Sequence, residues 1–199
     1  MTPFDYPTLP LARRHGPVGY QDYASFRPWL RDEFCFRCAF CLRRERWEPD
    51  ASVFEIDHLR PVSQFPALAL VYDNLIYSCA VCNSAKGTEA VPDPSRVLTA
   101  ASVSVEADGT LVPRTPAARR VVRQLDLNDP QFVLWRQQMI RIVALAAVHD
   151  PALNQSLLAY PDDLPDLSLL KPPGGNTLPD GIDQSHLRRR TEGTLPDTY

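Results

Sequence analysis

Three short motifs decide how this chain folds: RCAFC at 37–41, FEIDHLRPVS at 54–63 and CAVCNSAKG at 79–87. The first and the third each contain a Cys-x-x-Cys pair, so four thiols flank the Asp-His dipeptide of the second. Four thiolates are the ligand set of a tetrahedral structural zinc, and one tight turn can supply two of them. We therefore expect one zinc ion, bound by Cys38, Cys41, Cys79 and Cys82.

The alternative for these cysteines is two buried or disulfide-bonded pairs. Disulfides are typical of secreted proteins. The sequence shows neither a signal peptide nor an apolar run of about 18 residues. The pattern therefore favours zinc, and it predicts a cytoplasmic protein that makes no contact with a membrane.

The middle motif carries the candidate chemistry. Phe54-Glu55-Ile56 alternates and predicts a short strand that ends at Asp57-His58, and Pro61 then stops the regular structure. A single histidine beside an aspartate is most often a polar pair without a catalytic role. Here two asparagines, Asn74 and Asn83, fall within the same fifty residues as the four cysteines, which favours a functional site.

This segment resembles an HNH, or ββα-metal, endonuclease with a four-cysteine zinc knuckle, in which two strands and a helix hold one catalytic divalent ion. The resemblance implies five functional residues: His58 as the general base, Asp57 and Asn83 as metal ligands, Asn74 to fix the loop and orient the histidine, and Lys86 near the phosphate. It also places the first cysteine pair directly after Phe36-Arg37. Cys35, which competes as a ligand, is then expected to be a buried free thiol.

Two departures from the family pattern concern the loop and the last ligand. The Gly-Gly that commonly follows Pro-x-Ser is replaced by the residues of 64–72. The closing ligand is Asn83 instead of histidine, which implies an oxygen-rich site. Magnesium or manganese suits such a site better than zinc does.

The resemblance implies a metal-dependent endonuclease that hydrolyses phosphodiester bonds in DNA, with RNA left open as a substrate. The competing class is a zinc-knuckle nucleic-acid-binding module that has lost catalysis, and the joint presence of the five residues favours the enzyme. Similar small HNH proteins occur in restriction and anti-phage systems. That likeness implies a protein partner, such as an ATPase or sensor subunit, bound through the C-terminal tail.

The whole chain is expected to have an α+β fold: a ββα-metal HNH core braced by a four-cysteine zinc knuckle and flanked by helices and a β-hairpin. Its predicted regions are an N-terminal extension with a supporting helix (1–34), the nuclease core (35–90), a hairpin with two helices (91–149) and a Pro-rich tail (150–199). Helices are predicted for 21–34, 115–125 and 130–148, and a hairpin for 102–112. The tail is expected to be extended or disordered, with a linker at 172–175.

Local basic clusters matter because the net charge of −3 gives no overall basic character. Arg43, Arg44 and Arg46 lie beside Trp47 and could follow a nucleic acid backbone; a packed turn explains them equally well. Arg13-Arg14-His15 and Arg188-Arg189-Arg190 are weaker candidates. Further arginines decorate the two predicted helices after the hairpin: Arg119, Arg120, Arg123, Arg136 and Arg141.

Overall fold

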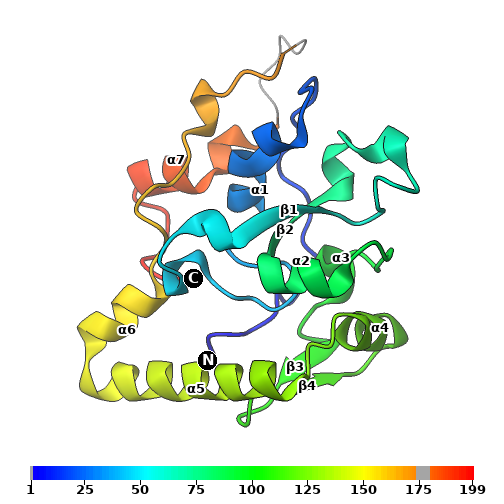
Figure 1. Cartoon of the computed structure of the whole chain (residues 1–199). Helices are drawn as coiled ribbons and strands as arrows, with labels where there is room; N and C mark the ends of the chain where they lie inside the picture. The colour runs from blue at the N-terminus through cyan, green and yellow to red at the C-terminus, as the bar shows by residue number, and fades with distance from the viewer. Residues whose placement is uncertain (1, 174–179) are drawn as a thin grey trace.

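A computed structural model describes residues 2–173 and 180–199 (Figure 1). Two two-stranded antiparallel sheets and several helices make up the described part of the chain, and this confirms the predicted α+β class. The strands are β1 (Phe54–His58), β2 (Leu75–Cys79), β3 (Val103–Val105) and β4 (Leu111–Pro113). The helices are α1 (Arg27–Glu33), α2 (Ala80–Lys86), α3 (Pro94–Val97), α4 (Pro116–Gln124), α5 (Pro130–His149), α6 (Pro151–Leu158) and α7 (His186–Thr191).

A ββα unit (residues 38–87) occupies the centre of the molecule (Figure 1). β1 pairs with β2 so that Phe54 lies opposite Cys79 and His58 opposite Leu75. All five residues of β2 are buried. Helix α2 follows β2 without a loop and ends at Gly87, whose positive φ of 56° is tolerated by glycine.

The helix predicted for residues 21–34 begins as a 3-10 turn, Tyr23–Phe26, and continues as α1. The side chain of Asp22 caps the turn, and Pro28 lies in the first turn of α1, where its missing N–H costs nothing. Trp29 and Leu30 are fully buried in the main core. Helix α1 therefore supports the ββα unit, as the sequence predicted.

The hairpin and the two helices after it also form where they were predicted. Thr115 caps α4 and Asp129 caps α5, each with a proline in the first turn. The turn between β3 and β4 contains Gly109 with φ +88°, and a Cβ there would lie 2.3 Å from the carbonyl oxygen of Val133. Only glycine allows the hairpin to pack this closely on α5.

Helix α5 lies along one edge of the molecule (Figure 1). Val143 of α5 is buried, and four more of its apolar residues pack partly against the core: Phe132, Trp135, Met139 and Ile140. Ala146 is also buried, whereas Ala147 is exposed. α5 has 20 residues, but neither it nor another described helix combines the length and apolarity needed to span a membrane.

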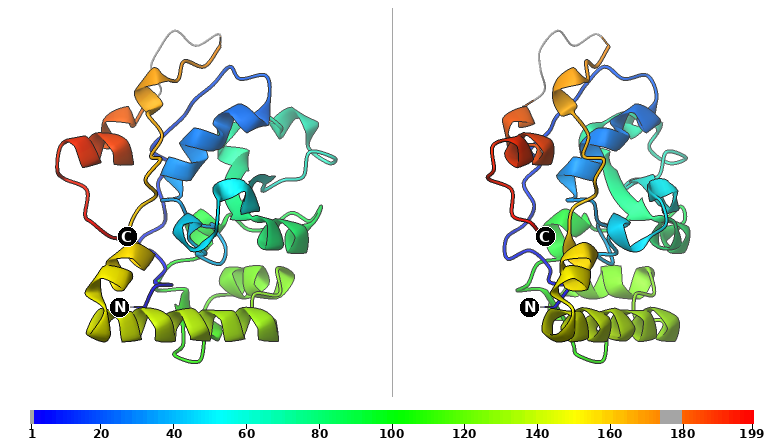
Figure 2. Two further views of the ribbon diagram at one scale, coloured as in Figure 1. Left: turned by 60° about the vertical axis from the view of Figure 1, so that its left-hand side comes forward. Right: turned by 90° about the vertical axis from the view of Figure 1, so that its left-hand side faces the viewer.

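The prediction of an extended or disordered tail is wrong for the described part of residues 150–199. Helix α6 packs on α5, and α7 lies beside α1 (Figures 1 and 2). The aromatic rings of Tyr160 and Tyr199 stack, and Phe36 joins them in a second small core. The last two residues of the predicted linker lie outside the described residues. The bounds of the four predicted regions stay a prediction.

Candidate active site

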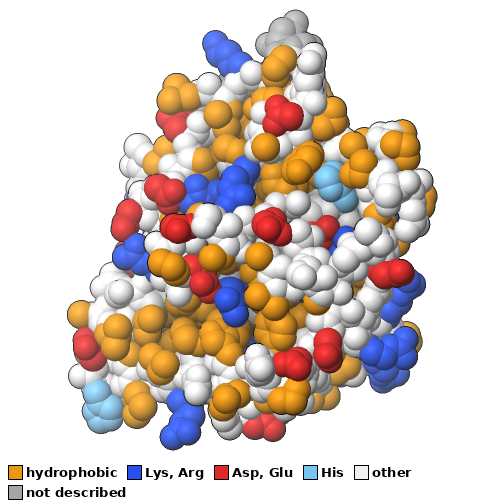
Figure 3. Space-filling view, viewed as in Figure 1, with side chains coloured by type: hydrophobic (Ala, Val, Ile, Leu, Met, Phe, Trp, Pro, Cys, Tyr) orange, Lys and Arg blue, Asp and Glu red, His pale blue; other side chains and the backbone are white. Residues whose placement is uncertain are grey.

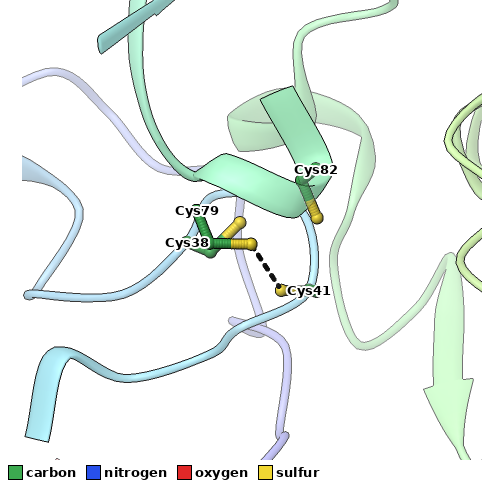
Figure 4. A group of neighbouring side chains, drawn as sticks. All are labelled: Cys38, Cys41, Cys79 and Cys82. Carbon is green, nitrogen blue, oxygen red and sulfur yellow. Dashed lines mark hydrogen bonds between the residues drawn. The ribbon is translucent and has the colours of Figure 1, made fainter. Parts of the chain in front are cut away.

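The four predicted zinc ligands meet in one buried cluster (Figure 4). Their sulfur atoms all lie within 4.8 Å of one another, and the Sγ atoms of Cys41 and Cys79 are 3.7 Å apart. Two thiolates on a tetrahedral zinc, each at about 2.3 Å, would lie about 3.8 Å apart. All five cysteines are free, so the disulfide alternative is wrong.

Short local contacts position the cluster. The N–H of Cys38 donates to the carbonyl oxygen of Arg43 at 2.8 Å, which closes the first knuckle. The N–H of Ala39 donates to Tyr77 in β2, also at 2.8 Å, and ties the knuckle to the sheet. Hydrogen bonds from the other three thiols lower the pKa of Cys79 well below its usual range. The thiolate form, which binds zinc, is therefore favoured for Cys79, whereas contacts within the same cluster raise the pKa of Cys41 and of Cys82.

Cys35 lies outside the cluster, as predicted, but it is half-buried. Burial raises the pKa of its thiol, yet a hydrogen bond with His186 and the nearby charge of Arg37 outweigh burial and lower the pKa. Cys35 is thus tied to the C-terminal segment instead of the zinc knuckle.

Two side-chain pairs join β1 to α2 beside the cysteine cluster. Glu55 and Asp57 are two residues apart on β1 and so share one face of the strand. Asn83 and Lys86 are three residues apart on α2 and so share one face of the helix. The amide nitrogen of Asn83 donates to Glu55, and the ammonium of Lys86 donates to Asp57 at 2.9 Å. Both predicted metal ligands, Asp57 and Asn83, therefore lie at the interface between β1 and α2.

Asp57 has one oxygen in use and one free. Its Oδ1 accepts from Lys86 and from the N–H of His58, the latter at 2.7 Å. Its Oδ2 is buried and accepts no hydrogen bond from any described residue. Burial raises the pKa of this carboxyl, and the opposing effect of Lys86 does not cancel the rise. A buried acceptor without a donor calls for a missing partner, and a divalent cation fits a carboxylate oxygen.

The orientation of Asn83 follows from its contact with Glu55. A carboxylate only accepts hydrogen bonds, so the amide must turn its NH₂ group toward Glu55. The Asn83 oxygen then points away from Glu55 and accepts no hydrogen bond from the described part of the chain. Glu55 was not among the predicted site residues, although its alternation with Asp57 placed both carboxylates on one face of the strand.

His58 ends β1 with its ring held from two sides. Its Nε2 lies 3.0 Å from the carbonyl oxygen of Ala69, and the ring of Tyr23 packs edge-on at 5.4 Å. A carbonyl cannot donate, so Nε2 carries a proton in this contact, and in the neutral imidazole Nδ1 then keeps its lone pair. The histidine is therefore presented as a proton acceptor. Tyr23 was not among the predicted site residues and lies in the helix predicted for 21–34.

Asn74 organises the loop between the two strands. Its side-chain oxygen accepts from the N–H of Arg60 at 2.9 Å, and its NH₂ donates to the carbonyls of Arg60 and Leu68, both at 3.1 Å. Leu68 precedes Ala69, whose carbonyl holds His58. The replacement for the missing Gly-Gly folds as 3-10 turns, Pro66–Leu68 and Tyr72–Asn74, around this asparagine.

Lys86 lies inside the contact between β1 and α2, and its role near a phosphate stays a prediction. Its side chain is buried and is paired with Asp57. Its contact fixes the Asp57 carboxylate, which leaves Oδ2 as the free oxygen.

The arginines that were predicted as candidate contacts to a nucleic acid backbone make their contacts within the protein. Arg43 pairs with Glu48 at 3.0 Å, and Arg46 pairs with Asp162 at 2.8 Å. Arg44 is buried beside Arg37, and burial lowers its pKa to about 10. The packed-turn alternative therefore explains this cluster.

The N-terminal basic cluster is also internal. Arg13 donates to the carbonyl of Leu75 at 2.7 Å, and its guanidinium lies over the ring of Phe34. Arg14 pairs with Asp32 at 3.2 Å. Neither arginine is directed at a ligand outside the protein.

A known family matches one segment of this chain. The sequence model of the HNH endonuclease family matches residues 38–89, the segment that contains both cysteine pairs and the β1–α2 contact. The predicted resemblance is thus confirmed for this segment, which is about a quarter of the chain. No curated protein matches the chain.

Proposed function

We propose, from the HNH match and the β1–α2 geometry, that this chain is a metal-dependent endonuclease that hydrolyses phosphodiester bonds in DNA. The observation that carries the proposal is the free, buried Oδ2 of Asp57 beside a histidine whose Nδ1 is left as an acceptor. A decayed binding module has no need for a buried carboxylate oxygen without a donor, because that arrangement destabilises the fold.

His58 is the general base in this proposal. Neutral imidazole accepts a proton from water at physiological pH, and the contact with Ala69 keeps the accepting nitrogen turned away from the loop. Asn74 holds that loop and so holds the ring. A divalent ion, when bound by Asp57 and Asn83, supplies positive charge against the leaving 3′-oxygen.

The donor atoms of each site also determine which metal ion the site prefers. Asp57 and Asn83 offer oxygen, which favours magnesium or manganese in the catalytic site. Lys86 and Glu55 position these two ligands through the hydrogen bonds described above. The four-thiol cluster offers sulfur alone in a tetrahedral spacing, so we infer structural zinc there.

The test is a cleavage assay with plasmid, single-stranded DNA and RNA, each with magnesium, manganese or chelator. The His58→Ala variant, prepared in the same way, controls for a contaminating nuclease. We expect cleavage of DNA with either metal and none with chelator. Cleavage of RNA alone would change the substrate class. If the zinc-loaded protein cleaves nothing, the zinc-knuckle binding module becomes the better account.

The biological setting is a separate prediction. Restriction or anti-phage defence, with an ATPase or sensor subunit as partner, rests only on the resemblance to small HNH proteins. The described part of the tail packs on its own core, so a partner would meet a folded surface there.

A further inference from the structure

Most arginines that lie close to the ββα unit make contacts within the protein. They pair with carboxylates, donate to backbone carbonyls or cover aromatic rings, as Arg13, Arg31 and Arg43 do. Arg136, predicted as a surface residue of its helix, is also buried and donates to the carbonyls of Gly109 and Leu127. Helix α4 is different, because its arginines remain on the surface.

Helix α4 has two opposite faces. Ala118, Val121 and Val122 are buried in the main core, together with Leu125 just past the helix end. The other face carries Arg119, Arg120 and Arg123. Arg119 and Arg120 lie four and three residues before Arg123, so both are neighbours of Arg123 on the helix surface. We call these three the α4 arginine face. All three are exposed, and none forms an ion pair with residues 2–173 or 180–199.

The α4 arginine face lies next to the candidate active site. Arg120 and Gln124 both donate to the carbonyl of Ala90, each at 3.3 Å. Ala90 is four residues beyond Lys86, and four residues of chain span at most about 14 Å. In Figure 1, α4 lies to the lower right of α2, and Figure 3 shows basic side chains gathered over that region of the same face.

We propose that the α4 arginine face binds the phosphate backbone of the nucleic acid substrate, to one side of the bond that is cut. This inference rests on the proposed nuclease function. Guanidinium groups bind phosphate oxygens with two parallel hydrogen bonds. Arg119 and Arg123 lose no internal hydrogen bond within the described residues when they do so, and Arg120 gives up only its 3.3 Å contact with Ala90. A duplex carries one charge about every 1.7 Å of its axis, so a backbone held at the site has further phosphates within reach of α4.

The charge of the whole chain strengthens this assignment. At a net charge of −3, the protein does not attract a polyanion in general. Binding therefore needs a local positive surface. The sequence suggested Arg43 and Arg46 for this surface, but both form ion pairs within the protein. The α4 arginine face supplies three positive charges that form no ion pair with the described residues.

The experiment measures binding of a labelled 30-base-pair DNA duplex at several salt concentrations, in a His58→Ala background that prevents turnover. The test variant adds Arg119→Gln, Arg120→Gln and Arg123→Gln. We expect affinity to fall at least about tenfold at low salt. The slope of log affinity against log salt should decrease by up to about 2.7, which is 0.9 for each lost phosphate contact.

A matched control removes the same number of charges from α7, on the opposite side of the molecule (Figure 1), by Arg188→Gln, Arg189→Gln and Arg190→Gln. It should keep the parental slope. Equal losses in the two triple variants, or an unchanged slope in the α4 variant, overturn the inference. If the triple variant misfolds, the double variant Arg119→Gln with Arg123→Gln tests the inference instead. Neither side chain forms a hydrogen bond with the described part of the chain, so their removal should not disturb the fold. A parent protein that binds neither DNA nor RNA contradicts the proposed function itself.

Discussion

The ββα unit and the C-terminal segment (residues 150–199) are 50 residues long each, yet they are held by different kinds of contact. The unit combines one pair of antiparallel strands, one helix and two cysteine pairs. All of these parts contact each other within the same 50 residues. The described part of the C-terminal segment depends on partners near the start of the chain. Tyr199, for example, donates to the carbonyl of Phe36. The ββα unit is therefore specified by nearby sequence, whereas the C-terminal segment depends on docking against distant residues.

A buried carboxylate anchors the C-terminal segment. Asp32 is fully buried, and its oxygens lie 2.9 Å from Nε2 of His15 and 3.0 Å from Nδ1 of His186. Burial alone raises the pKa of Asp32, but the hydrogen bonds from the two histidines lower it well below its usual range. This Asp32 network joins the N-terminal extension, α1 and α7.

The largest expected effect concerns the cysteine cluster. Cys79→Ser should abolish zinc binding and unfold the ββα unit, because structural zinc contributes about 10 kcal/mol or more to folding. Elemental analysis should find one zinc per wild-type chain and none in the variant. Cys35→Ser is the matched control and should keep its zinc. Zinc loss from the Cys35 variant would mean that the ligand set is wrongly assigned.

The next effect separates the two regions. Asp32→Ala leaves His15 and His186 without their buried acceptor, and breaking such a pair costs about 3–5 kcal/mol. We expect a lower melting temperature and faster proteolysis of residues 180–199, with zinc still bound. Asp162→Ala, which breaks only the exposed pair with Arg46, should leave the melting temperature close to that of wild type. Equal effects from the two variants would contradict the anchoring role of Asp32.

A smaller effect should appear with pH. Burial lowers the pKa of His186, but its hydrogen bonds with Asp32 and Cys35 raise it overall. The stability from a raised histidine pKa is complete below about 6.5 and is lost as pH rises through the folded value. The lowered pKa of Cys35 acts in the opposite direction, because its contribution grows as pH rises toward the ordinary thiol value.

This pH effect is best measured in Cys35→Ser, where the opposing group is absent. Hydrogen exchange of residues 186–191 should become faster between pH 6 and 9, beyond the intrinsic dependence of exchange on pH. Each unit of raised pKa corresponds to about 1.4 kcal/mol of docking free energy. The same profile in Cys35→Ser with His186→Gln would show that His186 is not the group responsible.

The smallest expected effect tests Glu55 within the ββα unit. Glu55→Gln keeps an oxygen that can accept from Asn83, whereas Glu55→Ala does not. If Glu55 only orients Asn83, manganese affinity measured by calorimetry should stay near wild type in the glutamine variant. It should fall several-fold in the alanine variant. Equal losses in both would instead indicate that the carboxylate itself binds the metal.

Local signals explain what the sequence could predict. The cysteine pairs, the strand before Asp57, and the capping residues Thr115 and Asp129 all act within a few residues, so their outcome is visible in the sequence. The C-terminal segment was missed because its Pro-rich composition is typical of disorder. Its order comes from partners more than 100 residues away, such as Asp32 for His186.

The same contrast holds within the candidate site. The resemblance supplied the predicted roles of Asp57, His58 and Asn83, and those roles stay proposals. The burial of Lys86 and the engagement of Arg43 and Arg46 depend on which elements pack together, and sequence spacing does not contain that information. For Glu55 the sequence did contain a signal, because the alternation of the strand places its side chain on the same face as Asp57.

The most direct measurement for the central claim is cleavage rate against manganese concentration for wild type, Asp57→Ala and His58→Ala. Asp57→Ala should weaken metal binding, so its activity should recover in part at high manganese. His58→Ala keeps both ligands but lacks the base, so it should remain about 10²–10⁴-fold slower at every concentration while still binding DNA. Cleavage by His58→Ala at the wild-type rate would contradict the account.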